Sequence, residues 1–341
     1  MVTLDDIRSA RQHLHGVSIH TPLIQCPHAA IPPSSQSQLW FKPESLQPMG
    51  AFKLRGAYNK IFSLSPEERR RGVITYSSGN HAQGVAYAAK LLGVKSVIVM
   101  PGTAPKIKIQ STAKYGAEIV LVGPSSSERQ VKAEALAREH GYVIVPPYDD
   151  EKIIAGQGTT GLEIVSDMPE VGCVLVPVGG GGLISGTATA LKLSRPGIKV
   201  VGVEPELAAD AQASLRSGKI VEYTGEQVAR TMADGLRTQR VGALPFELMR
   251  RYVDDIVTVT EAEIREAMRS LALKAKLVAE PSGAVTFAAF LFHGDKLPKA
   301  EQTVAVISGG NVAPELLAEV LSEPQRVSRT QEEARAGLQR K

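Results

Sequence analysis

Residues Val174–Gly186 read VLVPVGGGGLISG, and this stretch does most to decide the fold. An apolar, strand-like run ends in the four glycines Gly179–Gly182, and a helical pattern begins at Leu183. Consecutive glycines cost conformational entropy on folding, so we expect a functional reason for them. A glycine loop at a helix N-terminus presents unpaired N–H groups, and the helix dipole favours an anion there. A flexible turn is the alternative, but the stretch predicts a phosphate site. It is not a Walker P-loop, because no Gly-Lys-Ser/Thr follows.

The alternation of apolar strand and helix continues along most of the sequence. The predicted strands are Val73–Ser78, Ser96–Pro101, Glu118–Gly123, Tyr142–Pro146, Cys173–Gly179, Lys199–Pro205, Ile256–Thr260 and Thr303–Ser308. The predicted helices are Ala82–Leu92, Pro105–Tyr115, Ser126–Glu139, Leu183–Leu193, Glu261–Ala275 and Val312–Leu321. Continuous apolar strands between helices indicate a mainly parallel sheet that is covered on both faces. The predicted fold class is α/β.

An interruption of the strand–helix alternation divides the chain. The early strands are joined by short connections, and the stretch PPYDDE at Pro146–Glu151 then interrupts the pattern. We predict a small domain at residues 71–145, inserted into a large domain built from residues 1–70 and 146–341. Ligands of α/β proteins bind at the carboxyl ends of strands, so the site is expected in a cleft between the two lobes.

Composition excludes several classes of protein. The chain has 341 residues, a formal net charge of +4 and 5% aromatic residues. Because no cluster of basic and aromatic residues is visible, nucleic-acid binding is not expected. No stretch approaches the ~18 apolar residues of a membrane span. Two isolated cysteines and an N-terminus with Asp5 and Asp6 lead us to expect a cytoplasmic protein without disulfides or a targeting segment.

One glycine motif is interpreted as a decoy. Gly156–Gly161, GQGTTG, fits the dinucleotide pattern GxGxxG by letter. Only the short KIIA precedes it, and no acidic residue follows about 20 residues later to bind a ribose. We therefore expect a glycine-rich helix start that packs tightly on its neighbours.

The stretch KPESLQPMGAFKLRGA, residues 42–57, contains a lysine of interest. Lys53 follows Phe52 and opens a helical run, although a solvated helix lysine is the ordinary alternative. Two polar turns also follow predicted strands, at Ser77–His81 and Ser308–Asn311. Such turns offer backbone N–H groups to a carboxylate. One lysine, one phosphate site and two polar strand ends would suit a phosphorylated aldehyde held as a Schiff base.

These motifs together resemble the fold type II pyridoxal-phosphate enzymes, specifically the serine/threonine dehydratase and serine racemase group. In chain order they are KPESLQPMGAFKLRGA, SSGNHAQGVAYAAKLLG, IAGQGTTGLE, VPVGGGGLISG, VEPELAADA, MADG, AEPSGA and SGGN, between about residues 18 and 312. A small departure is Ala51, where many relatives carry serine. The resemblance implies a two-lobed α/β fold similar to the β subunit of tryptophan synthase, with mainly parallel sheets and helices on both faces.

The resemblance also implies roles for individual residues. Lys53 would bind the aldehyde of pyridoxal 5′-phosphate and act as the base at the substrate Cα. Ser308 would contact the pyridine nitrogen, which a neutral hydroxyl leaves largely unprotonated, and this favours loss of a β-substituent over a long-lived carbanion. The remaining cofactor contacts would be Phe52, Asn80 (to the ring 3′ oxygen), Gly179, Gly180, Gly181, Gly182 and Leu183. The substrate carboxylate would lie among Ser77, Ser78, Gly79 and His81. We interpret His81 as a loop-structuring or carboxylate-contacting residue rather than a base.

The stretch VEPELAADA suggests a cation site. In racemase-like relatives the positions that match Glu204, Ala208 and Asp210 bind a divalent cation through two carboxylates and one backbone carbonyl. Such oxygen ligands suit Mg²⁺ or Ca²⁺. The alternative is a pair of acidic residues at a helix start, where the dipole favours them.

The expected function is a pyridoxal-phosphate-dependent ammonia-lyase. It would convert a small β-hydroxy amino acid, L-threonine or L-serine, to a 2-oxo acid and ammonia, as a homodimer. One alternative is a 3-hydroxyaspartate dehydratase, for which Arg129 is a candidate partner of the distal carboxylate, although it also fits a surface helix. Another is a racemase, with Ser78 as the proton donor opposite Lys53. A catalytically silent binding module is disfavoured, because Lys53 and the cofactor set are intact.

Overall fold

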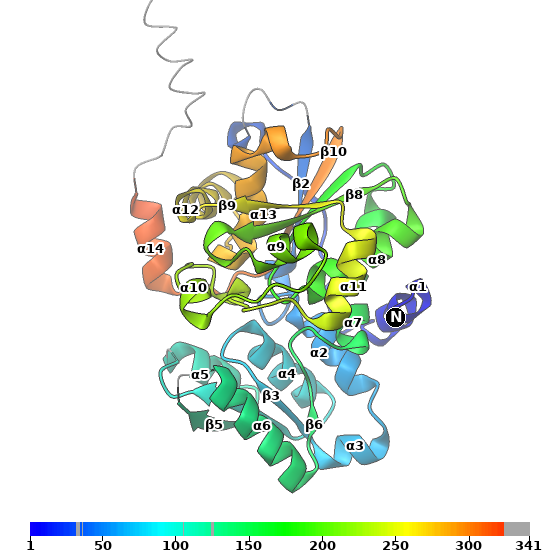
Figure 1. Cartoon of the computed structure of the whole chain (residues 1–341), viewed down its shortest axis with the longest axis vertical. Coiled ribbons are helices and arrows are strands. Elements are labelled where there is room, and N and C mark those ends of the chain that lie inside the picture. Colours follow the sequence, from blue (N-terminus) through cyan, green and yellow to red (C-terminus); the bar gives the residue numbers. More distant parts are fainter. Residues whose placement is uncertain (32–34, 36, 105, 124–125, 324–341) are drawn as a thin grey trace, which may run out of the picture.

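The protein contains two sheets, each covered by helices on both faces, in the computed structural model of the chain (Figure 1). The structure describes residues 1–31, 35, 37–104, 106–123 and 126–323. The last part of the predicted large domain, residues 324–341, lies outside these residues. No helix of the described chain is long and apolar enough to cross a membrane.

The larger sheet has six strands in the order β1-β2-β10-β7-β8-β9. β1 pairs antiparallel with β2, and all other pairs are parallel. The strands are β1 (Ile24–Gln25), β2 (Gln38–Pro43), β7 (Cys173–Pro177), β8 (Lys199–Pro205), β9 (Asp255–Val259) and β10 (Gln302–Ile307). Both ends of the chain thus contribute strands to one sheet.

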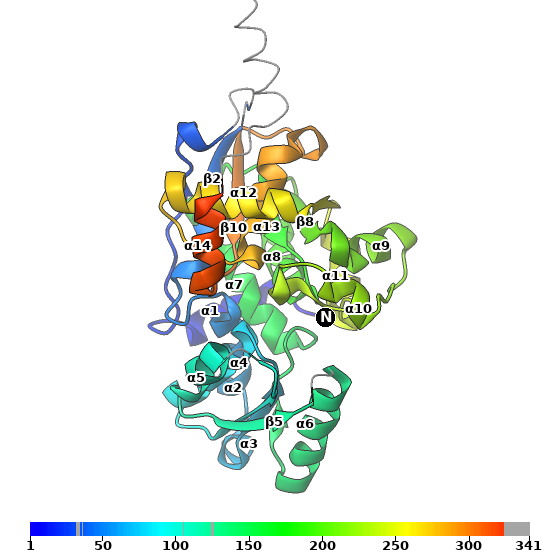
Figure 2. The same ribbon diagram turned by 90° about the vertical axis from the view of Figure 1, so that its left-hand side faces the viewer.

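The smaller sheet has four parallel strands in the order β5-β4-β3-β6. They are β3 (Val73–Tyr76), β4 (Ser96–Pro101), β5 (Glu118–Val122) and β6 (Val143–Ile144). Here "small lobe" means the part built around this sheet, and "large lobe" means the part built around the six-stranded sheet. The predicted boundaries near residues 70 and 146 remain a proposal, which this partition of strands supports. The two lobes lie one above the other along the long axis of the molecule (Figure 2).

Helices occur before, between and after the strands of the described chain. They are α1 (Leu4–His13), α2 (Lys53–Phe62), α3 (Pro66–Arg71), α4 (Asn80–Leu91), α5 (Lys106–Ala113), α6 (Ser126–His140), α7 (Glu151–Asp167), α8 (Gly182–Ser194), α9 (Asp210–Ser217), α10 (Gly225–Ala229), α11 (Ala243–Tyr252), α12 (Glu261–Ser270), α13 (Pro281–Phe292) and α14 (Pro314–Ser322). The helical pattern predicted for Glu261–Ala275 is correct up to Ser270, after which one π-helical turn follows (Leu271–Ala275).

Alternating side chains of the strands explain the layers of the large lobe. Along β7, Val174 and Val176 enter one apolar cluster, together with side chains of α8 and α11. Leu175 points to the opposite face and joins a cluster with side chains of α12 and α13. Successive side chains of a strand face opposite sides, so a sheet covered on both faces needs continuous apolar strands. The prediction of a mainly parallel α/β fold with helices on both faces is confirmed.

The decoy motif Gly156–Gly161 lies inside α7 rather than in a nucleotide-binding turn. A Cβ atom on Gly158 would lie 2.8 Å from the carbonyl oxygen of Gly186 on α8. These glycines therefore let helices approach closely, as predicted from the sequence, but the prediction that they form a helix start is wrong, because α7 begins at Glu151.

A buried network of charges fixes α2 to the large lobe. Arg55 of α2 donates from Nε to Glu44 over 2.8 Å and from Nη1 to Glu163 of α7 over 2.7 Å. Lys42, at the end of β2, donates to Glu163 over 2.6 Å and to the carbonyl oxygen of Thr21 over 2.6 Å. Burial opposes ionisation of Glu44, but the charge of Arg55 holds the pKa of Glu44 below its usual value. Because Lys53 is the first residue of α2, the network also determines where Lys53 lies.

Candidate active site

Lys53 begins α2 and points its amine to the segment that links the two lobes. Its Nζ donates to the carbonyl oxygen of Pro147 over 2.8 Å. Burial lowers the pKa of Lys53 to about 8, so a substantial part of the amine is neutral near physiological pH. The backbone N–H of Phe52 donates to the carbonyl oxygen of Ser308 over 3.0 Å. Phe52 and Lys53 of one predicted motif are therefore neighbours of Ser308, which belongs to another.

The glycine loop joins β7 to α8, as the sequence pattern predicts. Gly181 has φ +91°, a left-handed conformation that favours glycine, and α8 begins at the next residue. Within the described chain, no acceptor is found for the backbone N–H groups of Gly180, Gly181, Gly182 and Leu183. These donors stand at the positive end of a buried helix, which fits a phosphate group. Gly180 is also required by packing, because a Cβ atom there would lie 2.2 Å from the ring of Tyr148.

The loop Ser77–His81 leads from β3 into α4, and all of these residues except His81 are half-buried. The N–H of Gly79 lies 3.4 Å from Oγ of Ser77. The N–H groups of Asn80 and His81 open α4 without an acceptor among the described residues. The start of this helix can therefore bind a carboxylate, and Ser77 and Ser78 lie beside it.

The ring of His81 is bound to the segment that follows β6. Its Nε2 lies 2.9 Å from the carbonyl oxygen of Val145, which can only accept, so Nε2 carries the proton. Burial, together with the charge of Lys53, lowers the pKa of His81 to about 3. A neutral ring bound to Val145 structures the loop. Any contact of His81 with a carboxylate would come from its backbone N–H.

Asn80 and Ser308 lie in one polar cluster that includes residues for which we predicted no role. The Nδ2 of Asn80 donates to Oε1 of Glu280 over 2.7 Å. The Oδ1 of Asn80 accepts from Nδ2 of Asn311 over 2.8 Å. Ser308 is buried, with its Oγ 3.5 Å from the carbonyl oxygen of Ser282. Glu280 and Asn311 belong to the motifs AEPSGA and SGGN, which was the available signal, but their contacts with Asn80 are not local in sequence.

The linker between the lobes brings these parts together, although we had interpreted it only as a break. Val145 accepts from His81, Pro147 accepts from Lys53, and Tyr148 lies against Gly180. Three of the four residues Val145–Tyr148 thus contact the loop before α4, the lysine and the glycine loop. The amine, the phosphate-binding donors and the polar strand ends fit a phosphorylated aldehyde.

The predicted cation ligands lie at the end of β8 and the start of α9. Glu204 is buried and accepts from the N–H groups of Ala211 and Gln212, over 3.1 and 2.8 Å. Both carboxylate oxygens of Asp210 are buried and find no donor among the described residues. Burial raises the pKa of Asp210 to about 7, and burial with the nearby charge of Asp210 raises the pKa of Glu204. Two buried carboxylates of which one has no donor fit a cation.

The sequence analysis predicts a backbone carbonyl as the third protein ligand at this cation site. No group of three or more His, Cys, Asp or Glu side chains suited to a metal occurs in the described ranges. Ala208, in the short helix Glu206–Ala208 between the two carboxylates in sequence, is buried. Its carbonyl oxygen therefore remains the predicted third ligand.

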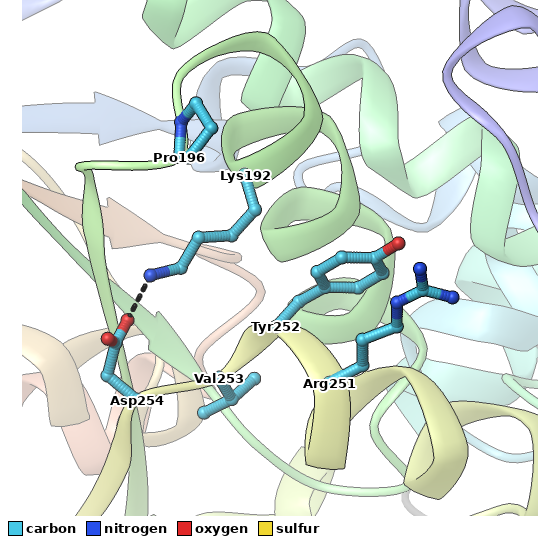
Figure 3. Close-up of a pocket in the computed structure, with 6 residues that line it drawn as sticks. All are labelled: Lys192, Pro196, Arg251, Tyr252, Val253 and Asp254. Atoms are coloured by element: carbon cyan, nitrogen blue, oxygen red, sulfur yellow. Dashed lines mark ion pairs between the residues drawn. The ribbon is translucent and has the colours of Figure 1, made fainter.

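A separate pocket of about 330 Å³ lies at the far ends of α8 and α11 (Figure 3). Lys192 in this pocket pairs with Asp254 over 2.6 Å, and Lys199 binds the same carboxylate over 3.0 Å. None of the predicted site residues lines this pocket. The pocket is therefore distinct from the site around Lys53.

Comparison with known proteins agrees with this geometry. Residues 17–309 match the family model described as pyridoxal-phosphate dependent enzyme. The chain is 44% identical over 322 residues to an L-threonine ammonia-lyase of Thermotoga maritima, covering 94% of this chain and 79% of the relative. It is 43% identical to an L-threo-3-hydroxyaspartate ammonia-lyase of Saccharomyces cerevisiae, covering 84% of this chain and 86% of the relative.

A solved structure is also similar to this chain. The serine racemase of Dictyostelium discoideum aligns with a TM-score of 0.85 and 38% identity, covering 92% of this chain and 99% of that one. The match of the family model, the identities and the shared fold agree on one assignment. The chain belongs to the family of pyridoxal-phosphate dependent enzymes.

Proposed function

We propose that the protein is an L-threonine ammonia-lyase that also accepts L-serine. The observation that carries the proposal is the amine of Lys53, whose pKa burial lowers to about 8, beside two strand-end loops rich in unpaired N–H groups. The 44% identity to an L-threonine ammonia-lyase supports the substrate assignment. The overall reaction releases a 2-oxo acid and ammonia.

In this proposal the chain contributes binding and one proton transfer. The N–H groups of Gly180–Leu183 bind the cofactor phosphate, Phe52 packs near the ring, and Ser308 contacts the ring nitrogen. When bound, pyridoxal phosphate supplies an electron sink for the substrate Cα. The neutral amine of Lys53 removes the proton from Cα, which requires an amine that is unprotonated at working pH. The β-hydroxyl then takes up one proton and leaves as water, which balances the proton that Lys53 removed from Cα. The released enamine becomes an imine, which water hydrolyses to the 2-oxo acid and ammonia.

Substrate orientation is assigned to the loop before α4. The N–H groups of Gly79, Asn80 and His81, with the hydroxyls of Ser77 and Ser78, bind the substrate carboxylate at the positive end of the helix. The ring of His81 stays neutral and holds the loop to Val145.

Two alternatives within the family differ in their substrate or outcome. A 3-hydroxyaspartate dehydratase is supported by the 43% identity to the yeast ammonia-lyase and by Arg129, a half-buried cation on α6 of the small lobe. A serine racemase with side elimination is supported by the structural match and by the presence of Ser78. All three reactions share Lys53 as the base.

A panel of substrates separates these functions. Purified holoenzyme is incubated with L-threonine, L-serine and L-threo-3-hydroxyaspartate, and release of 2-oxo acid is followed with each. We expect the highest kcat/KM with L-threonine. A tenfold preference for the hydroxyaspartate would overturn the substrate assignment, and absence of 2-oxo acid with all three would overturn the lyase.

Ser78 separates elimination from racemisation. A racemase needs a proton donor on the face opposite Lys53, whereas elimination from an L-amino acid needs only Lys53. We expect Ser78→Ala to abolish formation of D-serine from L-serine, while elimination survives at a reduced level. Chiral chromatography and pyruvate release measure the two reactions, with Ser322→Ala at the end of α14 as control. Unchanged racemisation in Ser78→Ala contradicts the donor role, and racemisation faster than elimination in the parent contradicts the lyase.

We also propose that Glu204, Asp210 and the carbonyl oxygen of Ala208 bind Mg²⁺ or Ca²⁺. A cation that binds only the folded state stabilises it by mass action. We therefore expect EDTA to lower the melting temperature and the activity, and Mg²⁺ or Ca²⁺ to restore both. Asp210→Asn should remove the response to the cation, whereas Glu206→Gln, an exposed neighbour, should keep it. Identical melting curves of metal-free protein with and without the cation would exclude the site.

Compartment and assembly complete the proposal. Cys26 and Cys173 are buried and free, and burial raises the pKa of each thiol to about 12, so neither is reactive. These thiols support a reducing compartment, the cytoplasm. We also propose that the protein forms a homodimer. Sedimentation velocity of the holoenzyme tests this assembly.

A further inference from the structure

A chain of hydrogen bonds runs from the segment before Lys53 to the start of α13. Asn311 donates from Nδ2 to the carbonyl oxygen of Met49 over 2.9 Å and to Oδ1 of Asn80 over 2.8 Å. Asn80 in turn donates from Nδ2 to Oε1 of Glu280 over 2.7 Å. Because a carbonyl oxygen only accepts, Met49 fixes the orientation of the Asn311 amide, and Asn311 fixes that of Asn80. The chain connects both lobes at the proposed position of the cofactor ring.

Glu280 ends this chain in a confined place. It precedes α13 as its N-cap residue, makes no side-chain capping bond and is 5% exposed. Its N–H donates to the carbonyl oxygen of Gly309 over 3.1 Å. A Cβ atom on Gly309 would lie 2.6 Å from Oε1 of Glu280 and 3.1 Å from Nδ2 of Asn80. The carboxyl group of Glu280 and the amide of Asn80 therefore meet beside Gly309, in the turn that follows Ser308.

We propose that Glu280 is a positioning residue that holds the amide of Asn80 for contact with the cofactor. The inference rests on the proposed contact of Asn80 with the ring 3′ oxygen. An amide nitrogen has two N–H donors, of which Glu280 takes one. With Oδ1 occupied by Asn311, the second N–H remains for the ring oxygen. Without Glu280, the amide loses the partner that fixes its nitrogen in place.

The charge of Glu280 supports this role. Burial raises the pKa of Glu280 to about 8, the charge of Asp234 adds to the rise, and the amide of Asn80 with the charge of Lys108 opposes it. The charge of Asp234 acts on Glu280 from the short helix Asp234–Leu236, and the charge of Lys108 acts on it from α5. Asp234 and Lys108 also form an ion pair with each other. Below pH 8 the carboxyl group is mainly neutral and accepts from Asn80 without adding negative charge near the ring oxygen. Above it, the carboxylate repels that oxygen.

The test measures cofactor affinity rather than turnover. Apoenzyme is prepared from holoenzyme by dialysis with hydroxylamine, and the Kd of pyridoxal phosphate is measured by fluorescence between pH 6.5 and 9.5. At pH 7 we expect Glu280→Ala to raise Kd about tenfold, the effect of losing one hydrogen bond to a buried group. Glu280→Gln, which still accepts from Asn80, should stay within about threefold. Asp254→Asn, a carboxyl group in the separate pocket, serves as control.

The pH profile supplies a second readout. From pH 7 to 9 the Kd of the parent should rise relative to that of Glu280→Gln by about threefold or more, because only the parent gains a carboxylate. Titration of Lys53 affects both proteins alike and cancels in this ratio. A ratio independent of pH contradicts the role of the neutral carboxyl group.

A double-mutant cycle decides whether Glu280 acts through Asn80. Near-ultraviolet circular dichroism first shows that each variant is folded, and if Glu280→Ala is not, the pH profile of the parent against Glu280→Gln decides the role. In the Asn80→Ala background, Glu280→Ala should change Kd less than twofold, since the shared partner is gone. Additive effects of the two substitutions, or a Kd of Glu280→Ala equal to that of the parent, overturn the inference. The Kd values of pyridoxal phosphate do not depend on which amino acid is the preferred substrate. Failure of this inference can therefore be distinguished from failure of the proposed lyase function.

Discussion

Lys53→Ala is expected to lower the turnover of L-threonine on the order of 10³-fold or more, because one substitution removes both the proposed base and the amine that binds the cofactor. The fold should survive. The side chain of Lys53 is half-buried, and among the described residues it donates one hydrogen bond, to the carbonyl oxygen of Pro147. The glycine loop should still bind the phosphate of pyridoxal phosphate non-covalently.

Initial rates of 2-oxobutanoate formation, measured with saturating cofactor, test this expectation. Lys90→Ala, which replaces an exposed lysine on α4, is the matched control and should keep the parental rate. The melting temperature of Lys53→Ala, compared with that of the parent apoenzyme, shows whether the fold is retained. Turnover within tenfold of the parent would mean that another group performs the proton transfer.

Arg55→Met should cause the largest loss of stability among substitutions near the site. The guanidinium group is fully buried and binds Glu44 and Glu163 at the same time. Removing it leaves carboxylates buried with a single cation, Lys42, and such uncompensated charges typically cost about 3–5 kcal/mol. We expect the free energy of unfolding to fall by about that amount.

Urea unfolding at a fixed cofactor concentration measures this loss, since bound cofactor contributes to apparent stability. Arg11→Met, on the exposed face of α1, serves as control and should change stability little. Arg55→Met together with Glu163→Met should recover part of the loss, because the unpaired carboxylate is removed. A loss of less than about 1 kcal/mol in the single variant would show that the network is not a determinant of stability.

Local patterns were sufficient to predict strands that are buried on both faces. The strand predicted at Lys199–Pro205 has those bounds in the structure, and the one predicted at Cys173–Gly179 ends at Pro177. Such strands are continuous apolar runs, and the glycine that follows marks their end. The start of α8 near Gly182, where we propose the phosphate site, follows from the same signal.

β2 was missed because its sequence, QLWFKP, contains polar residues that suggest exposure. Lys42 is nevertheless fully buried, since Glu163 and Thr21 provide its partners from distant parts of the chain. α13 was missed for a different reason. It is apolar all round and buried, so its sequence shows no helical periodicity and is also compatible with a strand.

In the candidate site, too, some residues could be predicted from local sequence signals and others could not. Lys53, the glycine loop and the loop before α4 could be selected from the sequence because each carries its own local signal. Glu280 and Asn80, in contrast, are 200 residues apart and meet only in the folded chain. The role of the linker at Val145–Tyr148 also depends on three contacts across the fold, which composition alone could not reveal.

Reduction of the holoenzyme with borohydride is the most direct test of the central claim, which is that Lys53 carries the cofactor. Borohydride converts an imine between a lysine and pyridoxal phosphate to a stable bond, and peptide mass mapping then identifies the lysine. The account predicts loss of the visible absorbance band and a single labelled residue, Lys53. A label on another lysine, or a protein that keeps its band and carries no label, would contradict it.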